Sequence, residues 1–90
     1  MNNQAMNSLE LKYETLIRDV LYSITGNDQF NKIKPGTNLS KYGFDSIMFI
    51  SVIVKLEEVL GIEIPNEFML VSKGDTIKKL NTLIEKMINR

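Results

Sequence analysis

The chain has 90 residues, which is enough for one domain with a single hydrophobic core. It contains no cysteine and no histidine, so it has no thiol of its own and lacks the commonest general base and the commonest metal ligand. Its eleven basic and eleven acidic residues cancel, so the whole chain shows no charge excess for binding nucleic acid.

The first residues do not look like a targeting segment. MNNQAMNS has neither the basic start nor the apolar stretch of a signal peptide. The longest nearly apolar run, from Ile47 to Val54, is interrupted by Ser51 and is far too short to cross a bilayer. We expect a soluble, cytoplasmic protein with a flexible N-terminus over residues 1–7 and one folded domain over residues 8–90.

An amphipathic helix is predicted from Ser8 to about Thr25. Its apolar residues recur at helical spacing, at Leu9, Tyr13, Leu16, Ile17, Val20, Leu21 and Ile24. Ser8 is a suitable N-cap, and Gly26 can adopt the left-handed conformation that ends a helix. The charged residues fall mostly on the other side, which indicates a core helix with a solvated back.

A long loop is predicted over residues 26–44. The segment GNDQFNKIKPGTNLSKYGF contains three glycines, one proline and three asparagines, and no period runs through it. Its isolated apolar residues are expected to pin the loop to the core; they are Phe30, Ile33, Leu39, Tyr42 and Phe44. Long ordered loops in small domains are often functional, and this one leads directly to Ser46.

A second helix is predicted from Asp45, which is a good N-cap, to about Leu60, with its end at Gly61. One apolar stripe is assigned to the core: Phe49, Val52 or Ile53, Leu56 and Leu60. A second stripe contains Ile47, Ile50 with Ser51, Val54 and Glu58. The apolar circumference is wider than one core contact requires, so the helix is either buried on two sides or available to a partner.

The remaining chain predicts one short and one long helix. Residues 62–65 are extended, residues 66–70 allow one or two helical turns, and Gly74 interrupts them. Asp75 or Thr76 caps a last helix with a lysine-bearing, solvated outer face. Its apolar residues are Ile77, Leu80, Leu83, Ile84, Met87 and Ile88. No strand is predicted, and the fold class is all-α: a small four-helix bundle of three long helices and one short, with a long loop between helices 1 and 2.

Two strings in this layout resemble a known family. GFDSI occupies residues 43–47 and LEEVLGIEIP occupies residues 56–65, after the long loop and before the last amphipathic helix. Over residues 9–89 the chain resembles the acyl and peptidyl carrier proteins of fatty-acid, polyketide and nonribosomal peptide synthesis. The G-x-D-S pattern of residues 43–46 alone would be a weak indication, whereas the whole order of elements is specific.

The resemblance implies a covalent cofactor and a set of partner enzymes. A phosphopantetheinyl transferase would attach 4′-phosphopantetheine from coenzyme A to Ser46, with Asp45 as the helix cap beside it. The thiol of that arm would hold acyl, aminoacyl or peptidyl groups as thioesters, and the carrier itself would catalyse nothing. We expect a monomer with no metal, no nucleic acid and no membrane partner. Its partners would be a loading ligase or adenylation enzyme and synthase, condensing or transferase enzymes. The residues expected to contact these partners are Phe44, Ile47, Met48, Ile50, Ser51 and Val54.

Physical chemistry independent of the resemblance agrees with this role for Ser46. The N-terminus of a helix presents free N–H groups and the positive end of the macrodipole, which favour a phosphodiester. A hydrolase using Ser46 is a poor alternative, because the string is not a G-x-S-x-G elbow, no S-x-x-K follows, and the chain has no histidine.

The second helix departs from the pattern of fatty-acid carriers, which spread acidic residues along it. Residues 47–54 contain no acid; only Glu57 and Glu58 follow, next to Lys55. Recognition would then depend on apolar contact more than on charge steering. This favours a discrete carrier of a polyketide, nonribosomal peptide or similar antibiotic-type pathway. A fatty-acid carrier and an unmodified carrier-like interaction module remain alternatives, and the cargo is not predicted.

Overall fold

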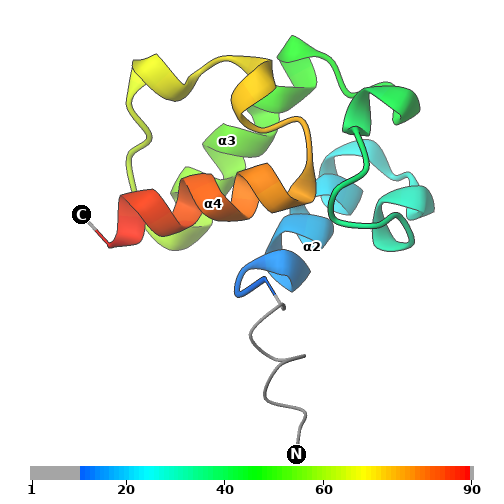
Figure 1. Cartoon of the computed structure of the whole chain (residues 1–90), viewed down its shortest axis with the longest axis horizontal. Helices are drawn as coiled ribbons and strands as arrows, with labels where there is room; N and C mark the ends of the chain where they lie inside the picture. Colours follow the sequence, from blue (N-terminus) through cyan, green and yellow to red (C-terminus); the bar gives the residue numbers. More distant parts are fainter. Residues whose placement is uncertain (1–10, 90) are drawn as a thin grey trace, which may run out of the picture.

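The computed structural model describes residues 11–89 of the chain. Within this range it has three α-helices, α2 (Glu14–Thr25), α3 (Ser46–Leu60) and α4 (Ile77–Ile88), and no strand. Figure 1 shows α4 running across α3, while the segment between them arches over the upper side of the molecule. The all-α prediction is confirmed for this part of the chain, in which no helix is long and apolar enough to cross a membrane.

Helix α2 begins later than the sequence pattern predicts. Its first residue is Glu14, and the predicted cap, Ser8, lies outside the described residues. No side chain of the capping residue, Tyr13, closes this end. Instead, the backbone N–H of Tyr13 donates to Oδ1 of Asn81 at 2.7 Å, so a residue of α4 caps α2 from a distance. Gly26 ends the helix with φ of 68°, as predicted.

The core lies where the three helices meet, and α3 contributes the predicted stripe. Phe49, Val52, Ile53 and Leu56 are buried, and Leu60 packs partly exposed against them. The buried apolar residues from the rest of the described chain are Ile17, Val20, Leu21, Phe30, Ile33, Leu39, Phe44, Ile64, Ile77, Leu80, Leu83 and Ile84. The phase predicted for α3 is therefore correct.

The long loop between α2 and α3 is ordered by two short 3-10 turns, η1 (Asp28–Asn31) and η2 (Leu39–Tyr42). Asparagine side chains cap both turns: Asn27 accepts from the N–H of Gln29, and Asn38 accepts from that of Ser40. Four of the predicted anchors are buried and Tyr42 is half-buried. The apolar residues therefore pin the loop to the core as predicted.

Two backbone hydrogen bonds join this loop to the start of α4. The N–H of Leu39 donates to the carbonyl of Asp75 at 2.8 Å, and the N–H of Lys78 donates to the carbonyl of Pro35 at 3.0 Å. These bonds satisfy polar groups that neither segment can satisfy alone. The chain that leads to Ser46 is therefore fastened to α4.

The fourth, short helix predicted over residues 66–70 is not an α-helix. The segment forms two 3-10 turns, η3 (Asn66–Phe68) and η4 (Val71–Lys73). Leu70 separates them with an extended backbone, φ −114° and ψ 132°, so the hydrogen bonds of one turn cannot continue into the next. Upstream, the carboxylate of Glu57 accepts from the N–H of Ile64 at 2.8 Å and fastens the extended segment to the end of α3.

Helix α4 resolves the choice between two predicted caps. The hydroxyl of Thr76 accepts from the N–H of Lys79 at 3.0 Å, whereas Asp75 forms an ion pair with the ammonium of Lys79 at 2.9 Å. Just before this cap, Gly74 is buried against the core. A Cβ added there would lie 2.7 Å from Cε1 of Phe49 and 2.8 Å from Cδ2 of Leu80, which leaves no room for a side chain.

Candidate functional site

Ser46 is the first residue of α3, and its side chain is exposed. Asp45 before it is extended, with φ −112° and ψ −174°, and its Oδ1 accepts from the N–H of Met48 at 2.9 Å. This confirms the predicted N-cap. The Ser46 hydroxyl forms no hydrogen bond with any residue between 11 and 89, so it is accessible and uncommitted.

Two aromatic rings from residues on either side of Ser46 in the sequence pack together and fix the start of α3. Phe44 and Phe49 pack edge to face, with ring centroids 6.3 Å apart and an interplanar angle of 79°. One precedes the start of α3 and the other lies within its first turns, so their contact holds the entry of the chain into the helix. The resemblance predicts Phe44 as a partner contact, but its side chain is only 3% exposed. Phe44 therefore supports the site from the core and offers no surface to a partner.

The other predicted partner contacts divide between surface and core. Ile47, Ile50 and Val54 are exposed by 75%, 50% and 43%, although large apolar side chains are usually buried. Ser51 lies among them and donates its hydroxyl to the carbonyl of Ile47 at 3.2 Å. Met48 is half-buried and packs against the core. The structure thus brings four of the six residues together on one exposed side of α3.

This apolar side of α3 borders a shallow groove against the end of α2. Ile50, Ser51 and Val54 line it together with Ile24 of α2, and its volume is about 320 Å³. Lys55 and Glu58 close it at one side, where their charged groups are 3.9 Å apart. An exposed pair at this distance adds little to stability. The groove is therefore mainly apolar, with a polar margin.

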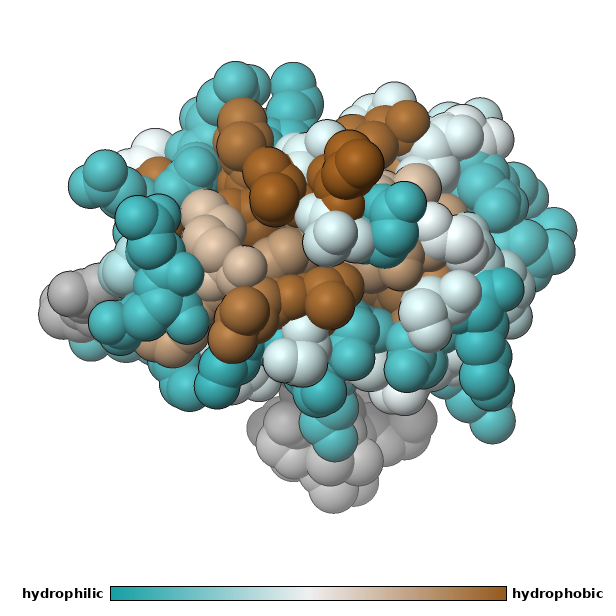
Figure 2. Space-filling view, turned by 90° about the horizontal axis from the view of Figure 1, so that it is seen from above, coloured by the Kyte–Doolittle hydropathy of each residue, from teal (hydrophilic) through white to brown (hydrophobic). Residues whose placement is uncertain are grey.

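Among residues 11–89, four further large apolar side chains are exposed, which the sequence pattern does not predict: Tyr22, Val59, Leu70 and Ile88. Val59 on α3 is 51% exposed, and Leu70 between η3 and η4 is 58% exposed. Figure 2 shows hydrophobic side chains gathered on the face seen from above, which in Figure 1 carries the start of α3 and the segment between α3 and α4. Leu70 has an extended backbone, so helical periodicity gives no signal there. Val59 lies outside the exposed stripe of α3, which continues from Val54 through Glu58.

The charges near Ser46 leave few chemical options for the protein's own residues. Asp45 is the only acid within the first turns of α3, and its carboxylate is engaged in the cap. Among residues 11–89 there is no cluster of acidic side chains that could hold a metal ion. The site offers a hydroxyl at a positive helix end, an apolar margin and no acid–base partner.

Comparison with known proteins identifies one family. A family model described as "phosphopantetheine attachment site" matches residues 15–84, which include all of α3, all but the first residue of α2 and most of α4. Neither the curated proteins nor the solved structures contain a significant match. The match therefore rests on the family pattern as a whole.

Proposed function

Since the chain belongs to the phosphopantetheine attachment family of carrier proteins, which bind 4′-phosphopantetheine covalently, we propose that Ser46 is the attachment residue. The observation that supports this proposal most is the position of Ser46. Of the three described α-helices, only α3 begins with a hydroxyl residue, and that hydroxyl is exposed and forms no hydrogen bond. Thr76 also has a hydroxyl at a helix start, but it is engaged with the N–H of Lys79.

The start of α3 favours the charge that the cofactor brings. The side chain of Asp45 accepts from the N–H of Met48 and its backbone carbonyl from that of Phe49, whereas the N–H groups of Ser46 and Ile47 donate to no acceptor among residues 11–89. A phosphodiester on Ser46 would face these groups and the positive end of the helix dipole. Such placement is worth about 0.3–1 kcal/mol for an exposed anion.

The carrier contributes a nucleophilic oxygen and little else to its own modification. The chain contains no histidine, and the carboxylate nearest to Ser46 is held by the backbone of α3. The base that takes the serine proton therefore belongs to the transferase. The same absence of catalytic groups leaves later acyl transfers to the partner enzymes.

The apolar side of α3 supports a more specific role. Residues 47–54 carry no charge, so docking on this side depends on shape and apolar area, with little electrostatic steering. We infer that the protein is a discrete carrier of a polyketide, nonribosomal peptide or similar thiotemplated pathway. Basic partner enzymes would recognise a fatty-acid carrier through acidic residues on this helix, and α3 has no acidic residue before Glu57.

The attachment is tested by intact mass after incubation with coenzyme A and a broad-specificity phosphopantetheinyl transferase. The wild-type chain should gain one phosphopantetheine, and Ser46→Ala should gain none. Ser51→Ala removes an exposed hydroxyl from the same helix and should still be modified. Unmodified wild type that is folded would support a carrier-like interaction module instead, and modified Ser46→Ala would place the cofactor elsewhere.

Docking through α3 is tested by Val54→Asp, which places a charge on the apolar side. We expect at least about a tenfold loss of loading by the cognate enzyme, because a desolvated carboxylate would oppose an apolar contact. Thr15→Asp adds the same charge to an exposed site on α2 and should leave loading unchanged. Equal loading of both variants, with helicity retained, would show that partners do not use this side.

A further inference from the structure

A second groove lies away from Ser46, between the segment 66–73 and α4. Its volume is about 450 Å³, and no residue of α2 or α3 lines it. The lining residues are Phe68, Ser72, Lys73, Lys78, Lys79, Thr82, Leu83 and Lys86. Nothing in the proposed attachment or docking of the carrier uses this region.

The charge of this groove is strongly one-sided. Four of its lining residues are lysines and none is acidic, although the chain as a whole is neutral. Lys79 is engaged by the carboxylate of Asp75 at 2.9 Å and by the carbonyl of Ser72 at 3.1 Å. The other three, Lys73, Lys78 and Lys86, form no ion pair with any residue in the range 11–89. The groove therefore holds three uncompensated positive charges.

Two of these lysines occupy positions that the helix dipole disfavours, and a third lies over an aromatic ring. Lys78 and Lys79 lie in the first turn of α4, where the helix dipole favours acids and disfavours cations. The ammonium of Lys86 lies 5.9 Å from the ring centroid of Phe68, so its stem covers the apolar floor while its charge stays at the surface. Leu83, which is 4% exposed, completes that floor.

We propose that this groove docks a short acidic segment of a partner protein that carries one large apolar side chain. The lysines around the margin match carboxylates, and Phe68 and Leu83 provide an apolar surface for the side chain between them. A small free anion fits less well, because the lysines are exposed and no buried donor points into the groove.

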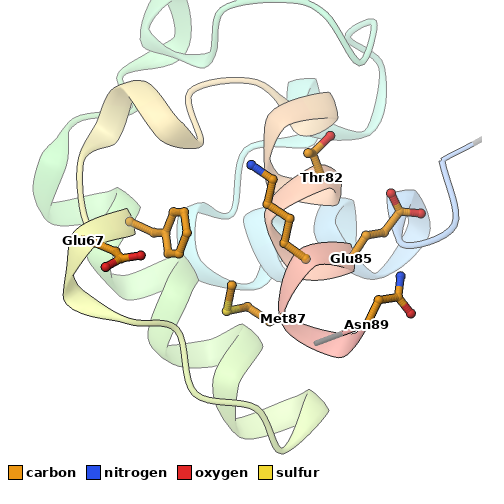
Figure 3. A pocket seen from close by; sticks show the side chains of 7 residues that line it. Glu67, Thr82, Glu85, Met87 and Asn89 are labelled. Carbon is orange, nitrogen blue, oxygen red and sulfur yellow. The ribbon is translucent and has the colours of Figure 1, made fainter.

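A second hollow lies next to this groove and limits the kind of polyanion that the groove can bind. It shares Phe68, Thr82 and Lys86 with the groove, but Glu67 and Glu85 line it as well. Figure 3 shows Glu67 coming from the segment after α3, Thr82, Glu85 and Met87 coming from α4, and Asn89 following the end of α4. A nucleic acid that continued beyond the groove would meet these carboxylates, whereas a short peptide segment would end before them.

The groove and the apolar side of α3 share no residue, so both surfaces can be occupied at once. A partner held at α4 would keep Ser46 and α3 free for a second enzyme and would raise the local concentration of the carrier. This second attachment point does not depend on which residue bears the cofactor.

The test titrates the full chain with a labelled peptide of glutamates flanking one leucine, followed by fluorescence anisotropy and amide chemical shifts. We expect shifts confined to residues 68–86 and binding that weakens with added salt. Lys78→Glu with Lys86→Glu should weaken binding at least about tenfold, because two attractive charges become repulsive. Lys34→Glu with Lys41→Glu changes the net charge equally at exposed loop positions and should have little effect.

Three results would overturn the proposal. In the first, a peptide with glutamines in place of glutamates binds as tightly, which would make charge irrelevant. In the second, the loop variant loses as much affinity as the groove variant, which would make the attraction non-specific. In the third, inorganic phosphate or a short single-stranded oligothymidylate displaces the peptide at lower concentration, which would assign the groove to a small anion or to nucleic acid. Circular dichroism of each variant ensures that all compared proteins are folded.

Discussion

Replacing Gly74 by alanine should destabilise the fold by forcing a methyl group into the contact between α4 and α3. The added Cβ would lie 2.7 Å from Cε1 of Phe49 and 2.8 Å from Cδ2 of Leu80. Ordinary carbon–carbon contacts lie at about 3.5–4.0 Å, so both neighbours would have to move by nearly an ångström. Phe49 is 1% exposed and Leu80 is fully buried, so neither has free space to move into.

The expected loss follows from overpacking a closed core. Inserting one methyl group where side chains cannot rearrange costs about 1–3 kcal/mol. The φ of Gly74 is −149°, outside the left-handed region, so the clash and not the backbone conformation carries this cost. Phe49 also packs against Phe44 beneath Ser46, so the same shift should disturb the start of α3.

Urea unfolding followed by circular dichroism measures this loss, and Gly36→Ala is the matched control. A Cβ at Gly36 meets nothing within 4 Å, and its φ is not in the left-handed region. That variant should be neutral or more stable by up to about 1 kcal/mol, because alanine restricts the unfolded chain. Gly74→Ala and Gly36→Ala with equal stability would refute the close packing of Gly74 against Phe49 and Leu80.

Other substitutions separate the remaining structural roles. Leu56→Ala should lower the free energy of unfolding by about 2–5 kcal/mol because the residue is fully buried, whereas Val59→Ala, at an exposed residue, should lower it by under about 0.5 kcal/mol. The reverse order in denaturant melts would mean that α3 is rotated about its axis. Asp45→Ala removes the helix cap and should lower the free energy of unfolding by about 0.5–2 kcal/mol, whereas Asp45→Asn should keep most of that stability. No recovery in the same melts would assign the loss to charge instead. Asn81→Ala should lower the free energy of unfolding by about 1–3 kcal/mol, because it leaves the N–H of Tyr13 unpaired. Thr82→Ala, at the exposed neighbouring residue, should lower it far less. Equal losses would show that this hydrogen bond is not needed.

Local chemistry made much of this protein predictable. The cap at Asp45, the end of α3 at Gly61 and the buried stripe through Phe49 and Leu56 each depend on residues close in sequence. The same is true of Thr76 at the start of α4. Helical periodicity and capping preferences report such features directly.

The features that were missed depend on contacts between distant segments. Asn81 looks like a polar residue on an ordinary helix, yet it is buried because it caps α2 from 68 residues away. Gly74 reads as a helix breaker, and nothing local reveals the ring of Phe49 above it. Phe44 is predicted both as a loop anchor and as a partner contact, and its burial against Phe49 supports only the first of these roles.

The backbone hydrogen bonds that join Pro35 and Leu39 to the start of α4 limit how far the loop before Ser46 can move. A segment of this length without regular structure would ordinarily act as a flexible lever that swings whatever follows it. Here two backbone hydrogen bonds hold it midway, which opposes such swinging. Movement of a bound cargo relative to the domain would then come from rotation about the single bonds of the prosthetic group, with the polypeptide serving as a fixed support.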